Sequence, residues 1–276
     1  GNILDFDNLT EENIYVLESP ILTNSQFKKF KKFFSKKVKT IDCSFDIEKS
    51  LKERIDLIRE EAETAVREGS TCLILSDKNI SNDYVPIPTL LAASAVHHFL
   101  IKEGLRMKIS LVVETGEARE LHHFAVLAGY GVEAINPYLV FNTISNLVGE
   151  EGYKKAQENF IKASGKAILK IMSKMGISTL KSYCGAQIFD AIGISEEVID
   201  RYFCGTASLI GGMNLGQIQQ ETVERYRKNI SSNLREINLD EGGEYAFRIS
   251  GEKHAWSPST ITNLQKAVRI NSKESF

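Results

Sequence analysis

The fold is decided by residues 71–138, which read TCLILSDKNISNDYVPIPTLLAASAVHHFLIKEGLRMKISLVVETGEARELHHFAVLAGYGVEAINPY. Short apolar runs at 71–76, 109–114 and 132–135 are typical of strands that are buried on both faces of a sheet. The segments between them are long enough for helices. Strands joined by helical crossovers of roughly a dozen residues lie parallel, because the crossover returns the chain to the same edge of the sheet. The stretch therefore predicts an α/β fold with a mainly parallel sheet.

The two helices expected within this stretch are marked at their ends. Residues 84–104 begin with two prolines, which a first helical turn tolerates, and close on a glycine. Residues 117–128 carry Glu117 and Glu120 in their first turn, where carboxylates interact favourably with the helix dipole. We expect both helices to begin close to these residues.

Outward from this stretch, the chain predicts further strand and helix units. A strand at 37–43 and a long amphipathic helix at 47–67 precede it. A helix at 139–148 that ends at Gly149 and a longer one at 153–175 follow it. We expect an N-terminal segment with an amphipathic helix at 1–36, an α/β core at 37–230 and a C-terminal hairpin and helix at 231–276. All three parts are expected to belong to one structural domain.

The C-terminal third has shorter patterns. Residues 185–192 predict a short helix, and Ser195 is a candidate cap for the helix after it. Residues 238–253 alternate aromatic and aliphatic side chains between glycine turns, which predicts a β-hairpin. Ser257 is expected to cap a last helix that starts at Pro258.

Polar residues follow each of the central strands. Ser76 and Asp77, Glu114 and Asn136 stand at the three strand ends. In parallel α/β folds the carboxyl ends of the strands are where ligands and partners bind. We therefore take Asp77, Glu114 and Asn136 as candidate rim or interface residues. The competing interpretation is that these side chains cap helices or brace neighbouring loops.

The charge balance gives no general reason to expect nucleic acid or an anionic membrane as a partner. The chain has 276 residues, 34 basic and 36 acidic side chains and 42% hydrophobic residues, enough for a full core. A basic cluster at 27–37 is interleaved with aromatics, but Phe27, Phe30 and Phe34 share one helical face. An amphipathic surface helix explains this cluster. No stretch reaches the apolar length of a membrane span.

The histidine pairs suggest a metal site only weakly. His97 and His98 form one pair, and His122 and His123 form the other. Adjacent helical residues point about 100° apart, so neither pair chelates one ion alone. Histidines that make contacts between helices are the favoured interpretation, and we expect no metal ligands.

The four cysteines, Cys43, Cys72, Cys184 and Cys204, form no Cys-x-x-Cys pair, so they predict neither a disulfide framework nor an iron-sulfur cluster. A cytoplasmic location fits this scatter. Cys72 lies in a buried strand, where thiols are inert. Cys184 precedes a glycine near an expected helix start, which would lower its pKa, although nothing places a histidine base beside it.

Residues 204–213 are rich in the small residues that let backbone amides approach a phosphate. They lack the P-loop lysine and do not match the dinucleotide-binding fingerprint. This glycine loop therefore predicts phosphate or flavin binding only weakly, and the residues by themselves predict no catalytic or cofactor-binding site.

Several runs of the sequence resemble the large subunit of glutamate synthase, in its central domain. The resemblance is carried, in chain order, by residues 73–81, 95–98, 103–106, 111–125, 129–131, 136–139, 172–179, 185–189, 205–208, 251–254 and 264–269. They span nearly the whole chain.

The resemblance implies a role within a larger enzyme. Members of that family make glutamate from glutamine and 2-oxoglutarate, and combine an N-terminal amidotransferase domain, a central domain, an FMN-binding barrel and a C-terminal β-helix. The amidotransferase nucleophile is an N-terminal cysteine, whereas this chain begins with Gly1. The resemblance therefore implies the central domain alone, with a topology like an incomplete TIM-like barrel. FMN and an iron-sulfur cluster are implied for the parent protein and not for this fragment.

Two classes of function stay open at this point. The first is a non-catalytic domain that connects the glutaminase and FMN-binding domains, in the same or an associated chain, and helps to enclose a passage for ammonia. The second is a free-standing α/β enzyme or a flavin- or phosphate-binding protein that uses the strand rim and the loop at 205–212. Neither class involves nucleic acid or a membrane.

Overall fold

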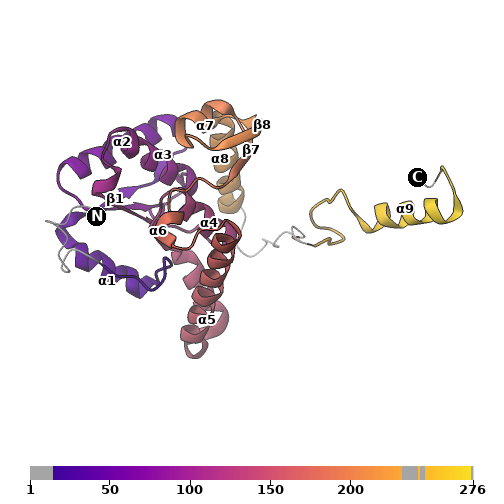
Figure 1. Cartoon of the computed structure of the whole chain (residues 1–276), viewed down its shortest axis with the longest axis horizontal. Coiled ribbons are helices and arrows are strands. Elements are labelled where there is room, and N and C mark those ends of the chain that lie inside the picture. The colour runs from indigo at the N-terminus through magenta and orange to yellow at the C-terminus, as the bar shows by residue number, and fades with distance from the viewer. Residues whose placement is uncertain (1–14, 232–241, 243–245, 275) are drawn as a thin grey trace. The chain divides into compact units, whose positions relative to one another are not determined.

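The computed structural model describes residues 15–231, 242, 246–274 and 276. Its chain divides into two compact units, Gly1–Arg227 and Lys228–Phe276, which are described separately here (Figure 1).

The first unit is built on a four-stranded parallel sheet. Its strands are β1 (Val38–Asp42), β3 (Cys72–Ser76), β5 (Ser110–Glu114) and β6 (Ala134–Asn136). They lie side by side in chain order, β1-β3-β5-β6, and every neighbouring pair is parallel. This arrangement confirms the predicted mainly parallel α/β fold. Sequential order with helical crossovers is also the winding of a β/α barrel, although the sheet of the described residues stays open.

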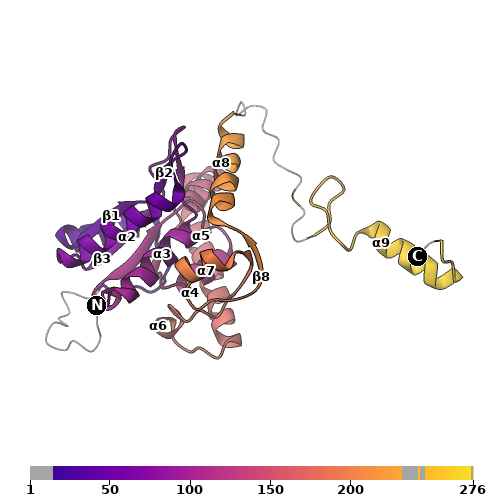
Figure 2. The same cartoon turned by 90° about the horizontal axis from the view of Figure 1, so that it is seen from above.

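Helices cover both faces of this sheet. One face packs against α2 (Leu51–Arg67), α3 (Thr89–Lys102) and α4 (Leu121–Gly129). The opposite face, formed by Cys72, Ile74, Val112 and Ala134, packs against α1 (Asn24–Phe34). Because side chains alternate along a strand, successive residues of each buried strand supply the two cores in turn. Figure 2 shows α2 and α3 lying along the strands.

The α1 helix forms as its sequence pattern predicts. Phe27 and Phe30 are buried on its sheet-facing side, while its lysines face outward. The Thr23 hydroxyl accepts a hydrogen bond from the Gln26 backbone N–H at 3.1 Å, and the Gln26 side chain accepts one from the Thr23 N–H at 2.9 Å. Thr23 is therefore a capping-box residue.

The beginnings of α3 and α4 differ from the prediction. The prolines do not start α3, because Tyr84–Pro86 forms strand β4, which pairs antiparallel with β2 (Ser44–Asp46). Glu117 lies in the loop before α4, and its carboxylate accepts the Thr89 backbone N–H at 2.6 Å. Glu117 was predicted to lie in the first turn of α4. It instead caps the start of α3.

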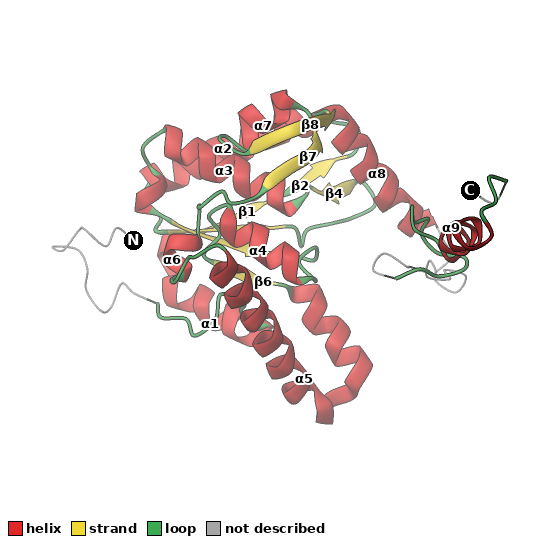
Figure 3. Cartoon of the chain, turned by 45° about the vertical axis from the view of Figure 1, so that its right-hand side comes forward, coloured by secondary structure: helices red, strands yellow, loops and turns green. Residues whose placement is uncertain are grey.

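The chain after β6 supplies a long interrupted helix. α5 (Tyr138–Lys174) is broken at Gly149, whose φ of 67° and ψ of −177° are not helical. The two predicted helices with a stop at Gly149 are therefore confirmed. α6 (Leu180–Tyr183), α7 (Glu196–Tyr202) and α8 (Leu215–Ser231) follow, and short 3-10 turns occur at Ser35–Lys37 and Arg106–Lys108 (Figure 3).

Two predictions in this region were wrong. The expected helix at 185–192 is instead β7 (Asp190–Ile194), and the expected glycine loop at 204–213 contains β8 (Ala207–Met213). These strands pair with each other in parallel. Gly212 lies against the backbone of Gly193, where a Cβ would come within 2.8 Å of the Gly193 Cα. Gly212 is needed because the two strands approach each other closely at this point. The local sequence pattern does not reveal that β8 packs against β7.

The second unit contains α9 (Pro258–Ile270). The Ser257 hydroxyl accepts the Thr260 N–H at 3.1 Å, so the predicted cap and the proline at the helix start are confirmed. The hairpin expected at 238–253 falls partly outside the described residues, and residues 246–253 form turns and bends rather than strands. The predicted boundaries near residues 36 and 230, and the single domain, stay predictions.

No helix in the described part of the chain is both long and apolar enough to cross a membrane.

Two capping positions give a testable contrast. The Thr23 hydroxyl caps α1, whereas the Ser195 hydroxyl at the start of α7 is buried and has no hydrogen-bond partner among the described residues. We expect Thr23→Ala to lower the free energy of unfolding by about 1 kcal/mol. Ser195→Ala removes a buried hydroxyl that lacks a partner, so it is expected to change stability by less than about 0.5 kcal/mol or to raise it. Urea unfolding of both variants measures the contrast, and equal losses would contradict it.

Candidate functional site

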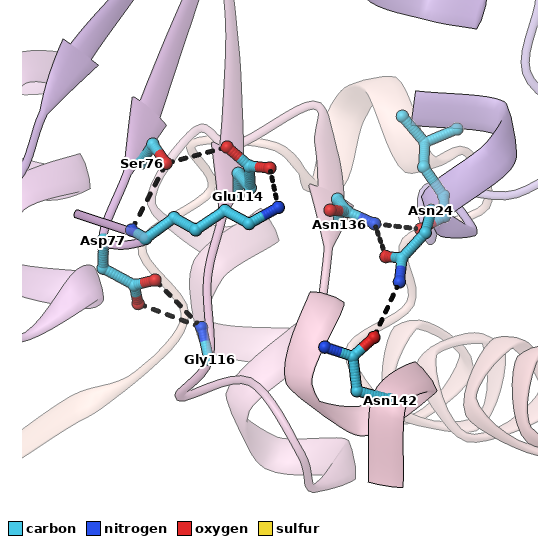
Figure 4. Close-up of polar contacts among 9 residues, drawn as sticks. Asn24, Ser76, Asp77, Glu114, Gly116, Asn136 and Asn142 are labelled. Carbon is cyan, nitrogen blue, oxygen red and sulfur yellow. Dashed lines mark hydrogen bonds and ion pairs between the residues drawn. The ribbon is translucent and has the colours of Figure 1, made fainter. Parts of the chain in front are cut away.

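The candidate rim residues form one row at the carboxyl edge of the sheet. The strand register aligns Asp42 with Ser76, Ser76 with Glu114, and Glu114 with Asn136. The structure thus brings the ends of these strands to one edge, as the parallel topology requires. Figure 4 shows how their side chains lie.

Asp77 follows β3 and fastens the loop after β5. Its carboxylate accepts the Gly116 N–H at 3.0 Å and the Thr115 hydroxyl at 2.6 Å. The Thr89 hydroxyl lies 3.4 Å from the same carboxylate and 2.7 Å from the Thr115 hydroxyl. Burial raises the pKa of Asp77, and the hydrogen bonds from Thr115 and Gly116 oppose that shift. Asp77 is therefore a buried anchor between two loops and the start of α3.

Glu114 is buried at the end of β5. It accepts the Ser76 hydroxyl at 2.8 Å, and the Lys78 ammonium lies 3.4 Å from its other oxygen. The Lys78 side chain is 60% exposed and also lies over the Tyr138 ring, 5.3 Å from its centre. The rim therefore holds its carboxylates inward and presents Lys78 to solvent.

Asn136 connects the end of β6 to the N-terminal part of the sheet. Its amide donates to the Leu22 carbonyl at 2.9 Å and to the Asn24 side-chain oxygen at 3.0 Å. Asn24 in turn donates to Asn142 in α5 at 3.2 Å. The row of asparagines joins the first turn of α1 to the first turns of α5.

Asp77, Glu114 and Asn136 thus have partners within the chain, and the structure brings them to one edge without gathering them on a common centre. In the part of the chain that the structure describes, no group of His, Cys, Asp or Glu side chains is arranged to hold a metal ion. Chemically, this arrangement binds loops together and leaves an exposed ammonium group at the rim.

A second polar cluster was not predicted. Arg106 donates through Nε to the His97 Nδ1 at 2.9 Å, and its guanidinium also donates to the carbonyls of Ile109 and Gly131 at 2.6 Å and 2.7 Å. The Glu133 carboxylate lies 3.4 Å from the same guanidinium. Local sequence carries no signal for this cluster, because its members come together only when α3 and α4 pack.

His97, His98 and His123 of the two histidine pairs make hydrogen bonds within the chain. The bond from Arg106 requires an unprotonated Nδ1 on His97, and burial together with the Arg106 charge lowers the pKa of His97 to about 3. The His98 ring lies 3.2 Å from the Gln187 amide nitrogen. His123 Nδ1 accepts the Glu120 backbone N–H at 3.2 Å. The His97 and His98 bonds agree with the interpretation of these histidines as contact residues, whereas His123 caps the start of its own helix.

The buried His97 predicts a loss of stability in mild acid. Its pKa is about 6.5 in the unfolded chain and about 3 in the folded one, so the unfolded state binds the extra proton. Stability should therefore fall as the pH drops below 6.5, by at most about 1.4 kcal/mol per pH unit for this group. His97→Asn keeps an acceptor for Arg106 and removes the titration.

We expect the stability of His97→Asn to fall less steeply between pH 6.5 and 4.5 than that of the parent chain. Urea unfolding at a series of pH values measures both slopes. Parallel slopes would show that His97 does not titrate differently in the two states.

The environments of Cys72 and Cys184 make their thiols unreactive. Burial raises the pKa of Cys72 to about 12. Burial and the nearby Glu133 charge raise the pKa of Cys184 to about 11, so the expected lowering at a helix start was wrong. Cys184 follows α6 rather than preceding a helix, and its thiol contacts the Val132 carbonyl.

A family model of the glutamate synthase central domain matches residues 1–195. This match covers most of the folded unit that carries the rim. The chain belongs to the glutamate synthase central domain family. The resemblance noted in the sequence is thereby confirmed.

Curated relatives agree with this membership. The chain is 45% identical to the large chain of glutamate synthase [NADPH] from Bacillus subtilis, over 94% of this chain and 17% of that protein. It is 37% identical to glutamate synthase [NADH] from Schizosaccharomyces pombe, over 100% of this chain and 14% of that protein. A chloroplastic ferredoxin-dependent glutamate synthase from Oryza sativa is 38% identical, with 100% and 18% covered. The central domain chain thus spans 14% to 18% of the length of these relatives.

Among solved structures, a flavocytochrome b2 variant with bound sulfite is 16% identical, with a TM-score of 0.41 over 59% of this chain and 37% of that one. A score of that size establishes no common fold.

Proposed function

We propose that this chain is the non-catalytic central domain of a glutamate synthase, and that it connects the glutaminase and FMN-binding domains of the same or an associated chain. The observation that carries the proposal is the alignment of 94% to 100% of this chain with 14% to 17% of proteins named as glutamate synthases. A chain of this share is one part of a much larger protein.

The rim geometry supports a positioning role. The Asp77, Glu114 and Asn136 side chains bind other residues of the chain, so they hold the loops at the strand ends in a fixed arrangement. A rigid edge suits a domain that keeps two distant active sites in register. Ammonia released into water is diluted and protonated, whereas an enclosed path keeps its effective concentration high. The domain would help to enclose that path during glutamate formation from glutamine and 2-oxoglutarate.

The proposal assigns the redox chemistry to the parent protein. FMN and an iron-sulfur cluster would belong to other parts of the parent oxidoreductase, which would act in ammonia assimilation in the cytoplasm. The present chain would supply neither catalytic residues nor cofactor ligands. Its described thiols do not form a group suited to a cluster.

The first test is the mass of the natural polypeptide, by immunoblot of an extract of source cells with an antibody raised against this chain. A band several times larger than 30.9 kDa is expected. A band near 30.9 kDa would overturn the assignment to one long chain, and would leave a subunit that assembles with separate glutaminase and FMN-binding chains or an independent protein. The second test is a titration of this chain with FMN, followed by flavin fluorescence. Saturable binding would favour the flavin-binding alternative.

A coupling assay tests the positioning role in the full-length synthase. Lys78→Met removes the exposed rim charge, while Glu114 keeps its bond from Ser76. If the rim faces a neighbouring domain, the glutamate formed per glutamine hydrolysed should fall at least twofold. Lys102→Met, at the exposed end of α3, is the control and should leave this ratio unchanged. An unchanged ratio in both variants would remove the rim from the proposal.

A further inference from the structure

The β7 and β8 strands form a parallel pair with an exposed apolar face. Ile192 in β7 is 73% exposed, and Leu209 and Ile210 in β8 are 100% and 60% exposed. The register places Ile192 directly opposite Ile210, with Leu209 beside them at an irregularity in the pairing. Three large aliphatic side chains therefore gather on one side of a two-stranded sheet. We call this surface, formed by Ile192, Leu209 and Ile210, the outer face.

The inner face of the same pair is covered. Ala191 and Ile194 pack against the main core, and α7 lies against both strands. The exposed aliphatic side chains therefore lie on the face of the pair that is turned away from the core. Figure 3 shows the pair between α7 and α8 at one side of the unit.

Two glycines of the pair have open space beside them. Among the described residues, a Cβ on Gly211 or on Gly193 would meet no atom within 4 Å. Of the residues in β7 and β8, Asp190 at one end carries a charge. The surface fits an uncharged, apolar partner.

The central sheet shows how this chain treats a second sheet face. There the face opposite α2, α3 and α4 is covered by α1, with Phe27 and Phe30 buried against Ile74 and its neighbours. Parallel strands are generally covered on both faces, and a two-stranded sheet has little stability alone. The β7–β8 pair lacks the counterpart of α1 in the described part of the chain.

We propose that the outer face of β7–β8 is a docking surface, covered in the intact protein by an apolar surface from another part of the same glutamate synthase polypeptide. This inference rests on the proposed function. This chain corresponds to 14% to 18% of the length of its relatives. The rest of such a polypeptide is long enough to contain a segment that covers the outer face.

The small size of the patch favours a cover from the same polypeptide over a second copy of the chain. A stable interface between separate proteins buries roughly 1,200 Å² or more, and three aliphatic side chains contribute only part of that area. Covalent connection gives a tethered segment an effective concentration in the millimolar range, so a small apolar patch is enough to keep it in place.

The test is thiol protection in the full-length holoenzyme that carries Leu209→Cys. The substitution replaces an exposed side chain, so it should not disturb this domain. The enzyme is treated with a maleimide, and modification at residue 209 itself, separated by peptide fragmentation from modification of the exposed Cys204, is quantified by mass spectrometry. The same enzyme unfolded in guanidinium chloride gives the reference rate. Lys102→Cys, at the exposed end of α3, is the control in the same domain.

We expect the thiol at position 209 to react at least tenfold more slowly in the native enzyme than in the unfolded one, with the same protection after a hundredfold dilution. The thiol at position 102 should react at similar rates in both states. Rapid native labelling at position 209 in an enzyme that still forms glutamate overturns the inference. Protection that disappears on dilution also overturns it, because a second copy would then be the cover.

The single-chain form of the proposed function fails by a different measurement, the mass of the natural polypeptide. If that mass is near 30.9 kDa, no other part of the chain exists to cover the outer face, and this inference falls with that form of the proposed function. If the mass is several times larger, labelling at position 209 decides the inference alone.

Discussion

Gly131→Ala is expected to destabilise the domain by more than about 3 kcal/mol, or to prevent its folding. Gly131 has a φ of +90°, a conformation that residues with a Cβ rarely adopt. A Cβ at this position would overlap the His97 ring, coming within 2.9 Å of Cγ. His97 cannot move away easily, because it is buried and accepts a hydrogen bond from Arg106. Backbone strain and overpacking therefore add at one site.

The matched control for this variant is Gly69→Ala. Gly69 also has a positive φ, 93°, but among the described residues a Cβ there would meet no atom within 4 Å. Only the backbone strain applies, so we expect a loss of about 1 kcal/mol. Thermal and urea unfolding of the two variants separate strain from overlap. Similar losses at both positions would show that the His97 contact contributes nothing.

Asp77→Ala is expected to lower the free energy of unfolding by about 3 kcal/mol. The substitution leaves the Gly116 N–H and the Thr115 hydroxyl without their acceptor at the buried rim. An unsatisfied buried polar group costs about 1–3 kcal/mol, and Asp77 serves more than one donor. Burial raises the pKa of Asp77, which shows that keeping its carboxylate out of water has a cost. In the parent chain this cost offsets part of the stability that the hydrogen bonds of Asp77 contribute.

Two further variants define the origin of that loss. Asp77→Asn keeps one oxygen acceptor but adds amide donors that face the Gly116 N–H, so an intermediate loss is expected. Asp83→Ala changes an exposed aspartate in the loop before β4 and should alter stability by less than about 0.5 kcal/mol. Urea unfolding at pH 7 ranks the three variants. A loss for Asp77→Ala no larger than that for Asp83→Ala would contradict the anchoring role.

The sequence predicted the central strands because their signal is local. The runs that became β3 and β5 are continuous, aliphatic and flanked by polar residues, and both strands are almost fully buried. The pattern of α1 likewise placed Phe27 and Phe30 on the buried face. The predicted order of strand and helix units, together with parallel topology, also placed Asp77, Glu114 and Asn136 at one edge.

The prediction failed where a residue's role depends on a distant neighbour. Glu117 was read as the first turn of its own helix, but its carboxylate accepts the N–H of Thr89, 28 positions earlier in the chain. The glycines at 211 and 212 were read as part of a loop whose backbone amides could approach a phosphate, but they lie in strand β8, where Gly212 permits close approach to Gly193 of β7. A glycine in the sequence indicates that the backbone has conformational freedom there. It does not indicate which other segment of the chain will pack against that position.

By itself, then, the sequence determined the α/β class, the parallel central sheet, the amphipathic α1 and the family to which the chain belongs. These features follow from hydrophobic periodicity and from runs of residues that are adjacent in the chain. Only the tertiary structure decided that Asp77 anchors Gly116, that Arg106 holds His97 beside Gly131, and that β7 pairs with β8. The physical reason is that hydrogen bonding and close packing act between atoms brought together by folding, and their partners are fixed only when the helices have packed on the sheet.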